Sequence, residues 1–205
     1  MHHDALNTAL LQGILHRDID GNRRSFLTRA GILGCGAVAY ALIPRGVQAK
    51  PQSGLMTRKT TFKLHHMHTG ETLHRTLSGQ EMQDPVFQKE MNHFMRDWRT
   101  GEVYPIDPDL ITLLSGVIHK VKTPTPLHIV SGYRSPKTNR LLKQQGRQVA
   151  KKSFHMTGKA VDLYIPGTSL RTLRNAATSF KKGGVGVYER SGFMHMDVRG
   201  KPVYW

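Results

Sequence analysis

The chain has 205 residues, which is long enough for one domain with an appendage and for a substantial hydrophobic core. Its hydrophobic content of 38% excludes a wholly disordered chain. The formal net charge is +16, because 30 Lys and Arg residues stand against 14 Asp and Glu residues. An acidic partner is therefore expected, and the candidates are nucleic acid, anionic lipid and an anionic polymer such as the bacterial cell wall.

The N-terminal segment, residues 1–49, has the layout of an export signal. Arg23 and Arg24 are followed by Ser-Phe-Leu, an apolar stretch covers residues 30–43, and residues 47–49 read Val-Gln-Ala, a small-x-small cleavage pattern. The paired arginines resemble a twin-arginine (Tat) signal. The apolar stretch is shorter than the roughly 20 residues that a membrane span needs, so cleavage is expected. The alternative is an inner-membrane anchor that is never cut.

The only cysteine, Cys35, lies in this signal. Cleavage after Ala49 would leave a mature chain, residues 50–205, with no cysteine, no disulfide and no thiolate to act as nucleophile or metal ligand. That part of the chain keeps 25 Lys and Arg against 11 Asp and Glu. The basic character therefore belongs to the functional part of the protein.

A linker over residues 50–60 precedes the expected domain, residues 61–205. Residues 61–77 alternate with a period of two around a His-Thr-Gly-Glu turn, which predicts a β-hairpin. Asp84-Pro85 predicts the start of a helix that ends at Gly101, with Val86, Met91 and Phe94 among its core-facing residues. Asp107-Pro108 predicts the start of a second, strongly apolar helix.

The second half of the chain alternates between strands and helices. Residues 127–135, LHIVSGYRS, predict a short strand that runs into a polar turn. Further strands are predicted at 159–165, 185–188 and 193–198, and helices at 136–145 and 169–181, with a basic loop at 146–153. Helices followed by a mainly antiparallel sheet that is interrupted by helices indicate an α+β fold.

The stretch SFHMTGKAVDLYI, residues 153–165, combines this strand with polar residues of chemical interest. Side chains alternate across a strand, so Val161, Leu163 and Ile165 are expected to face the core and Asp162 the opposite side. A carboxylate is disfavoured in the middle of a strand. Asp162 is therefore a candidate functional residue.

The last strand repeats this arrangement, with His195 and Asp197 on the face opposite Met194 and Met196. His155, in the loop before the earlier strand, could fold over the polar face. Two imidazoles and one carboxylate are a common catalytic zinc set that leaves the fourth position for water. Taken singly, His155 and His195 are each better explained as a surface or capping histidine, and it is their combination with Asp162 that favours a metal site.

Three motifs carry a family resemblance: SGYRS at 131–135, SFHMTGKAVD at 153–162 and FMHMD at 193–197. They resemble the motifs of zinc D-Ala-D-Ala peptidases, which have the hedgehog/DD-peptidase fold. The middle motif matches S-x-H-x-x-G-x-A-x-D at every fixed position. The resemblance covers nearly the whole chain and is closest to the MepK-like murein endopeptidases, which Gram-negative bacteria export through the Tat pathway.

The resemblance implies that His155, Asp162 and His195 bind Zn²⁺ in a cleft on one face of the sheet. It also implies that Arg134 stabilises the developing oxyanion, the alternative being a structural ion pair with a helix carboxylate. Tyr133, Ser153 and Lys152 are expected to bind substrate. For Ser153, capping of the loop is an equal alternative.

The general base is the point at which the chain departs from its relatives. Many of them have an acidic residue three positions before the last histidine ligand, and here that residue is Gly192. Asp197 is the first candidate because it shares a strand face with His195. An equal alternative for Asp197 is a hydrogen bond that orients His195. The other candidate bases are Glu189, His65, His66 and His68.

The resemblance implies a zinc-dependent murein endopeptidase that hydrolyses peptide cross-links of peptidoglycan in the periplasm. The stem peptides are anionic and suit a basic protein, and a basic stretch before His155 could flank the substrate or be a solvated face. Alternatives are a D,D-carboxypeptidase acting on stem peptides and a non-catalytic, zinc-containing wall-binding module. Nucleic acid is not an expected partner, since no nucleic-acid-binding motif is present. The sequence makes no prediction about oligomeric state.

Overall fold

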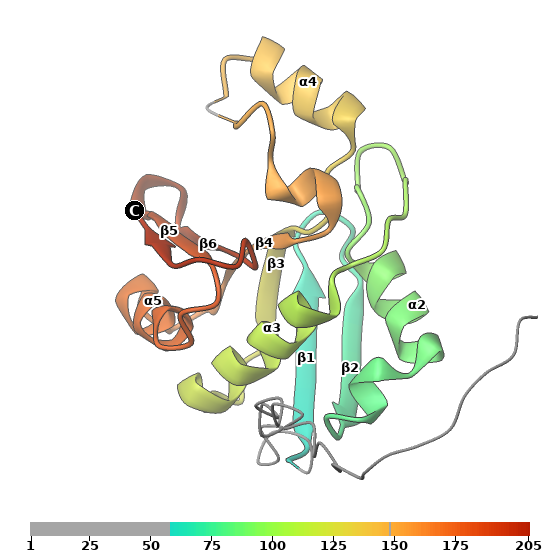
Figure 1. Cartoon of the computed structure of the whole chain (residues 1–205), viewed down its shortest axis with the longest axis vertical. Helices are drawn as coiled ribbons and strands as arrows, with labels where there is room; N and C mark the ends of the chain where they lie inside the picture. The colour runs from blue at the N-terminus through green and yellow to red at the C-terminus, as the bar shows by residue number, and fades with distance from the viewer. Residues whose placement is uncertain (1–57, 148) are drawn as a thin grey trace, which may run out of the picture. The chain divides into compact units, whose positions relative to one another are not determined.

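The structure is a computed structural model that describes residues 58–147 and 149–205. The predicted signal, residues 1–49, and most of the predicted linker lie outside these residues. The described chain begins with β1 (Thr60–His66) and β2 (Thr72–Leu77), which pair in antiparallel fashion as the predicted hairpin (Figure 1). Gly70, with φ of +73°, occupies the turn between them and adopts a backbone conformation that favours glycine.

Seven strands form one sheet in the order β2-β1-β3-β4-β6-β5-β7. The later strands are β3 (Leu127–Ser131), β4 (Ala160–Tyr164), β5 (Gly184–Tyr188), β6 (Phe193–Asp197) and β7 (Val203–Tyr204). The pairs β1–β3 and β5–β7 are parallel, and the other pairs are antiparallel. Together with the helices, this sheet gives the α+β architecture that the sequence predicts.

The α-helices are α2 (Pro85–Phe94), α3 (Pro108–Val121), α4 (Pro136–Gln144) and α5 (Leu170–Thr178). Short 3₁₀ turns occur at η1 (Glu81–Gln83), η2 (Phe154–Thr157) and η3 (Glu189–Ser191). Each α-helix begins after a residue whose side chain accepts a hydrogen bond from a backbone N–H of the first turn: Asp84, Asp107, Ser135 and Ser169. These caps satisfy backbone groups that a helix start leaves unpaired.

Helix α2 is shorter than predicted and ends at Phe94 instead of continuing to Gly101. The buried carboxylate of Asp97 accepts hydrogen bonds from the backbone N–H groups of Arg99 and Ser135, at 2.9 and 2.8 Å, and so stabilises a turn. The prediction that Val86 faces the core is wrong, because its side chain is 77% exposed. The buried stripe of α2 passes through the next residue, Phe87, about 100° further around the helix.

The hydrophobic core covers one face of the sheet, where α3 crosses it (Figure 1). Val161, Leu163 and Ile165 from β4 and its end are buried in this core, as are Met194 and Met196 from β6. Their burial fixes the register of both strands and turns the intervening side chains to the other face. Helix α4 stands apart from this core at one end of the domain (Figure 1).

Within residues 58–147 and 149–205, every helix is too short or too polar to cross a membrane.

Candidate metal centre

His155 is positioned by a short turn whose two ends are both fixed. The Ser153 hydroxyl accepts a 3.4 Å hydrogen bond from the backbone N–H of His155 at the start of η2. Gly158 ends the turn with φ of +65°, and a Cβ atom at this position would collide with the carbonyl oxygen of Pro105. The fixed glycine of the motif is therefore required by backbone geometry, and the turn delivers the His155 ring to the polar face of β4.

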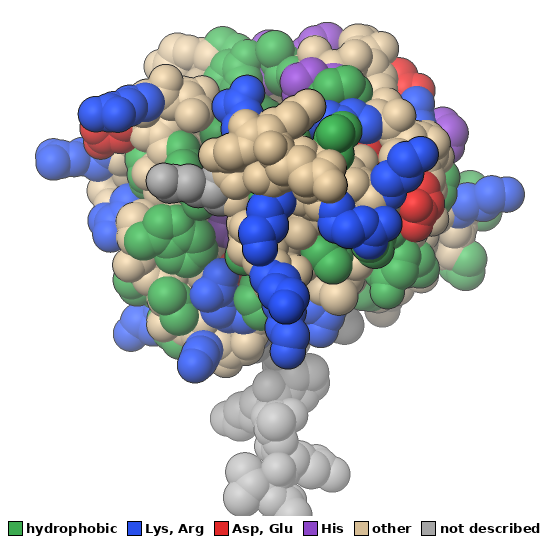
Figure 2. All heavy atoms as spheres, turned by 90° about the horizontal axis from the view of Figure 1, so that it is seen from above, with side chains coloured by type: hydrophobic (Ala, Val, Ile, Leu, Met, Phe, Trp, Pro, Cys, Tyr) green, Lys and Arg blue, Asp and Glu red, His purple; other side chains and the backbone are tan. Residues whose placement is uncertain are grey.

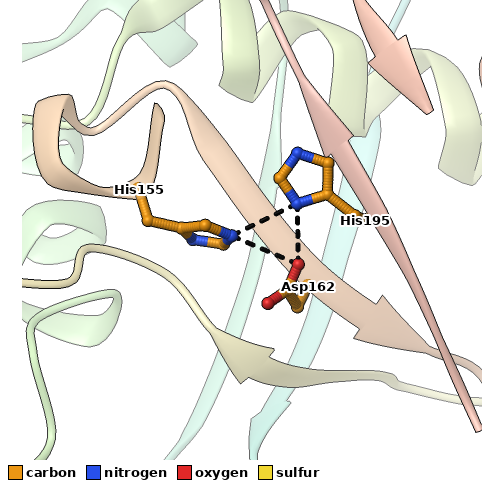
Figure 3. A group of neighbouring side chains, drawn as sticks. All are labelled: His155, Asp162 and His195. Carbon is orange, nitrogen blue, oxygen red and sulfur yellow. Dashed lines mark hydrogen bonds and ion pairs between the residues drawn. The ribbon is translucent and has the colours of Figure 1, made fainter. Parts of the chain in front are cut away.

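Three side chains meet on that face (Figure 3). His155 Nε2 lies 3.2 Å from Asp162 Oδ1 and 3.2 Å from His195 Nδ1, and His195 Nδ1 lies 2.8 Å from Asp162 Oδ1. Asp162 and His195 are directly opposite each other in the β4–β6 pairing. All three residues are buried, so the structure brings together the predicted His155, Asp162 and His195.

The outer nitrogen of each imidazole has an oxygen acceptor of its own. His155 Nδ1 lies 2.7 Å from the carbonyl oxygen of Gly132, and His195 Nε2 lies 3.0 Å from Asp197 Oδ2. A carbonyl or carboxylate oxygen accepts, so each outer nitrogen donates its N–H. The inner nitrogens then present lone pairs toward each other and toward Asp162, which is the tautomer that metal ligation needs.

A group of three facing acceptors requires a positive charge between them. Burial alone would raise the pKa of Asp162, but its interactions with His155 and His195 outweigh this effect and hold the pKa below the ordinary range. Burial lowers the pKa of His195, whereas the nearby carboxylates of Asp162 and Asp197 favour the charged imidazole and raise the pKa to a net value above normal. Ligands of one tetrahedral zinc ion lie roughly 3.4 Å apart, close to the separations observed, so the residues fit this ion.

Asp197 lies behind His195 and away from the cavity. Its side chain is completely buried, and its Oδ1 accepts hydrogen bonds from the backbone N–H groups of Gly184 and Arg199, at 2.9 and 3.1 Å. The Arg199 guanidinium donates to both carboxylate oxygens. This geometry favours the orienting role over the general-base role for Asp197, because the carboxylate has no access to a water molecule in the cavity.

A cavity of about 290 Å³ opens in front of the three converging side chains. Of the residues expected to act on substrate, Arg134, Ser153 and Lys152 line it. Four aromatic residues also line it, Phe154, Tyr188, Phe193 and Trp205, together with Val149, Ala150 and Arg199.

Trp205 lies beside one of the converging side chains. Its ring centroid lies 5.5 Å from that of His195, and its Nε1 donates a 3.2 Å hydrogen bond to the hydroxyl of Tyr188. A Cβ atom at Gly186 would collide with the indole, so a glycine on β5 makes this position possible. The Arg199 guanidinium lies 5.2 Å from the Trp205 ring and 4.9 Å from the Phe154 ring.

Arg199 and Trp205 are residues that the sequence reasoning missed. Arg199 lies two positions after Asp197 in the same polar segment, and Trp205 is an aromatic residue outside the three motifs. Neither position carries a motif of its own. Their place on the cavity wall follows from the tertiary fold and not from a local sequence pattern.

Arg134 lies beside the converging side chains and is nearly buried. Its Nη2 atom is 3.5 Å from Asp162 Oδ2, and its backbone N–H donates to the carbonyl oxygen of His155 at 3.1 Å. The guanidinium thus pairs with a strand carboxylate instead of the helix carboxylate considered above. Among the described residues, its Nε has no hydrogen-bond partner.

Tyr133 does not lie at the cavity, contrary to expectation. Its hydroxyl donates a 2.7 Å hydrogen bond to Glu102, and its ring stacks on Tyr104 with centroids 4.8 Å apart. The backbone N–H of Tyr133 donates to the carbonyl oxygen of Met95, which holds this segment against the end of α2. These contacts turn Tyr133 away from Arg134 and give it a structural role.

The other candidate bases also lie away from the cavity. Glu189, His65, His66 and His68 are absent from its lining. His66 points into the core beside Phe94, with ring centroids 5.9 Å apart. Gly192, three positions before His195, adopts φ of +71°, a backbone conformation that residues with a side chain rarely take. Within the described residues, Asp162 is the only carboxylate on the cavity wall.

Comparison with known proteins places the chain in a family. The family model described as "Peptidoglycan L,D-endopeptidase MepK" matches residues 55–205. The chain is 36% identical to the peptidoglycan L,D-endopeptidase MepK of Escherichia coli (strain K12) over 186 residues, which cover 91% of this chain and 98% of that protein. It is 33% identical to the probable peptidoglycan L,D-endopeptidase MepK of Haemophilus influenzae over 180 residues, 87% of this chain and 93% of that protein.

Among solved structures, the L-Ala D-Glu endopeptidase ChiX of Serratia marcescens matches 45% of this chain and 69% of its own, with 20% identity and a TM-score of 0.30. That similarity is too low to bear on the fold or the site. The family match spans the hairpin, the sheet and all three converging side chains. The chain therefore belongs to the peptidoglycan L,D-endopeptidase MepK family.

Proposed function

We propose that this protein is a zinc-dependent endopeptidase that hydrolyses L,D-peptide cross-links of peptidoglycan. The observation that carries the proposal is the convergence of His155 Nε2, His195 Nδ1 and Asp162 Oδ1, with both outer imidazole nitrogens already hydrogen-bonded. Membership of the MepK family supports the substrate and the type of bond.

In this proposal His155, Asp162 and His195 hold the zinc ion. Bound zinc would lower the pKa of a water molecule toward neutrality and polarise the carbonyl group under attack. The carbonyl oxygen of Gly132 and the carboxylate of Asp197 keep the two imidazoles in the ligating tautomer and orientation. Asp197 is in turn held by the Arg199 guanidinium.

Arg134 stabilises the negative charge that develops on the carbonyl oxygen during attack. Its guanidinium lies on the cavity wall, 3.5 Å from Asp162, and its position is fixed by burial before substrate arrives. Preorganised positive charge of this kind is worth more in a water-poor site than in bulk solvent. Lys152 and Ser153, on the same wall, are the proposed partners of substrate carboxylates.

The aromatic side of the cavity packs against the aliphatic parts of the substrate. Phe154, Tyr188 and Trp205 bring rings to the cavity beside the polar centre. Removing water from this side would strengthen the interactions of Arg134 and of the metal-binding residues. The aromatic residues thus contribute binding energy and a low dielectric constant, while Arg134 and Lys152 contribute charge.

We also propose export through the Tat pathway to the periplasm, on the layout of residues 1–49 as a signal and of residues 61–205 as the catalytic domain. The peptidoglycan substrate of this family lies in the same compartment. A fusion of residues 1–49 to a folded reporter should be exported, and Arg23→Lys with Arg24→Lys should abolish export. Unchanged export of that variant would contradict the Tat assignment.

The test of the activity is a digest of purified cross-linked muropeptides with the zinc-loaded protein, followed by mass analysis of the products. An L,D-endopeptidase separates two stem peptides, whereas a D,D-carboxypeptidase releases only a terminal D-alanine. His155→Ala should abolish cleavage. Unchanged cleavage by this variant would contradict the assigned metal centre.

A second candidate is a zinc-containing module that binds the wall without cutting it. The observation that favours it is the lack, among the described residues, of a second carboxylate on the cavity wall. In that case the fully zinc-loaded protein would bind sacculi and leave every cross-link intact.

A further inference from the structure

One end of the domain carries a surface of exposed cations, which we call the α4 basic surface. It consists of five side chains on α4 and the loop after it: Lys137, Arg140, Lys143, Arg147 and Lys151. No Asp or Glu occurs anywhere between Asp109 and Asp162 in the sequence. Figure 2, which views the molecule from the end where α4 lies, shows Lys and Arg side chains gathered over this face.

The α4 basic surface is continuous with the cavity. The loop after α4 reaches the cavity wall at Val149, Ala150 and Lys152. The side-chain amide of Asn139, on α4, donates a 3.1 Å hydrogen bond to the carbonyl oxygen of Ala150 and ties this loop to the helix. A ligand that occupies the cavity and extends past Lys152 would therefore meet α4 next.

The five cations of the α4 basic surface repel one another, and no acidic side chain forms an ion pair with them among the described residues. Within residues 58–147 and 149–205, the ion pairs involve none of the five side chains of the α4 basic surface. Like charges gathered in this way destabilise the folded chain, and an acidic ligand would relieve the repulsion. The cavity itself, at about 290 Å³, is at the small end of ligand sites and encloses only the groups nearest the scissile bond.

We propose that the α4 basic surface binds the free carboxylates of stem peptides next to the cross-link being cut, so that the protein recognises peptidoglycan as a polymer. The inference rests on the proposed function and adds a second binding region to it. A short soluble muropeptide would fill the cavity but leave α4 without a ligand. Intact peptidoglycan would engage both regions at once, and its local concentration at the cavity would rise.

The test uses a triple variant, Lys137→Gln, Arg140→Gln and Lys143→Gln, whose glutamines preserve helix propensity. The matched control, Lys89→Gln, Arg171→Gln and Lys182→Gln, removes the same charge from exposed positions away from the cavity. Two quantities are measured for each zinc-loaded protein: the Kd for purified sacculi by co-sedimentation, and kcat/KM on a purified muropeptide dimer.

The α4 variant should bind sacculi about tenfold more weakly, which corresponds to roughly twofold to threefold for each exposed contact. The control should retain wild-type affinity, and both variants should cleave the dimer within about twofold of wild type. Equal losses of sacculus binding in the two variants, or no loss in either, would overturn the proposal. So would a loss of dimer cleavage as large as the loss of binding.

Failure of the proposed activity gives a different pattern. If wild-type protein does not cleave the dimer, the endopeptidase assignment fails, and sacculus binding by the two variants still decides the role of the α4 basic surface. Circular dichroism and Tm establish that both variants are folded. If the triple variant is not folded, Arg140→Glu takes its place and should weaken sacculus binding, and unchanged binding would overturn the proposal.

Discussion

The carboxylate of Asp197 and the imidazole of His195 are joined by a 3.0 Å hydrogen bond on the edge of the ring that faces away from Asp162. The opposite nitrogen, Nδ1, points to the centre where the three side chains converge (Figure 3). Asp197 thus acts on the site through His195. Its complete burial separates it from the cavity.

Asp197→Asn tests this relationship. The variant should raise the Kd for zinc about 10- to 100-fold, because an amide holds the His195 ring less firmly and makes it less basic. Chelator competition measures that Kd, and kcat is measured with zinc in excess. Restored kcat at saturating zinc supports an orienting role. Full zinc affinity with a large loss of kcat would instead identify Asp197 as the general base.

Arg199→Met should destabilise the fold, because it removes the cation that neutralises a completely buried carboxylate. The loss in the free energy of unfolding should be about 2 kcal/mol, the range for hydrogen bonds to charged groups. Urea unfolding of the metal-free protein measures it, and Arg199→Lys should recover part of the loss. Equal stability of Met and Lys variants would show that the charge on Arg199 contributes nothing.

Arg134→Gln should lower kcat by about 10²- to 10³-fold while leaving zinc content unchanged, since the guanidinium is proposed to act on the developing oxyanion. Steady-state kinetics on a muropeptide dimer and metal analysis of the same sample provide the two values. A variant that loses zinc, or that changes only KM, would exclude this role.

Gly158→Ala should destabilise the protein by roughly 2–4 kcal/mol, because the left-handed backbone and the collision with Pro105 act together. Gly146→Ala is the matched control: its φ is +74°, but nothing lies within 4 Å of the added Cβ atom. The control should lose only about 1 kcal/mol. Similar losses in both variants by urea unfolding would show that contact with Pro105 does not matter.

His66 should make stability depend on pH. Burial lowers its pKa to about 4, with a smaller contribution from His68, so the folded chain keeps this ring neutral. Below pH 6.5 the unfolded chain binds a proton that the folded chain does not. The free energy of unfolding should therefore fall as pH drops from 6.5 to 4, by up to about 1.4 kcal/mol per pH unit.

Comparison with His66→Gln isolates this contribution. The variant should show a shallower fall in stability over the same pH range, whatever its stability at pH 7. Urea unfolding of the metal-free proteins at several pH values gives both curves. Parallel curves would contradict the prediction.

The parts of the site that local patterns determine could be predicted from the sequence. The alternation of Val161, Leu163 and Ile165 placed Asp162 on the polar face, and the structure has these three residues buried in the core. The pairs Asp84-Pro85 and Asp107-Pro108 start helices where predicted, since capping depends on a few neighbouring atoms.

Features that depend on distant contacts could not be predicted. Tyr133 adjoins Arg134 in the sequence, but its backbone hydrogen bond to Met95 and its contact with Glu102 turn it away from the cavity. Strand alternation places Asp197 on the same face as His195, yet it does not reveal which edge of the imidazole the carboxylate meets. Trp205 reaches the site only because β5 has a glycine beneath it.

The most direct test of the account is one experiment on protein purified without chelators: zinc content per chain, measured alongside the products of a digest of cross-linked muropeptides. We predict one zinc ion per chain and separated stem peptides that carry the termini of a hydrolysed L,D-bond, with both signals lost in His155→Ala. A wild-type protein that contains one zinc ion and leaves the cross-links intact would contradict the account.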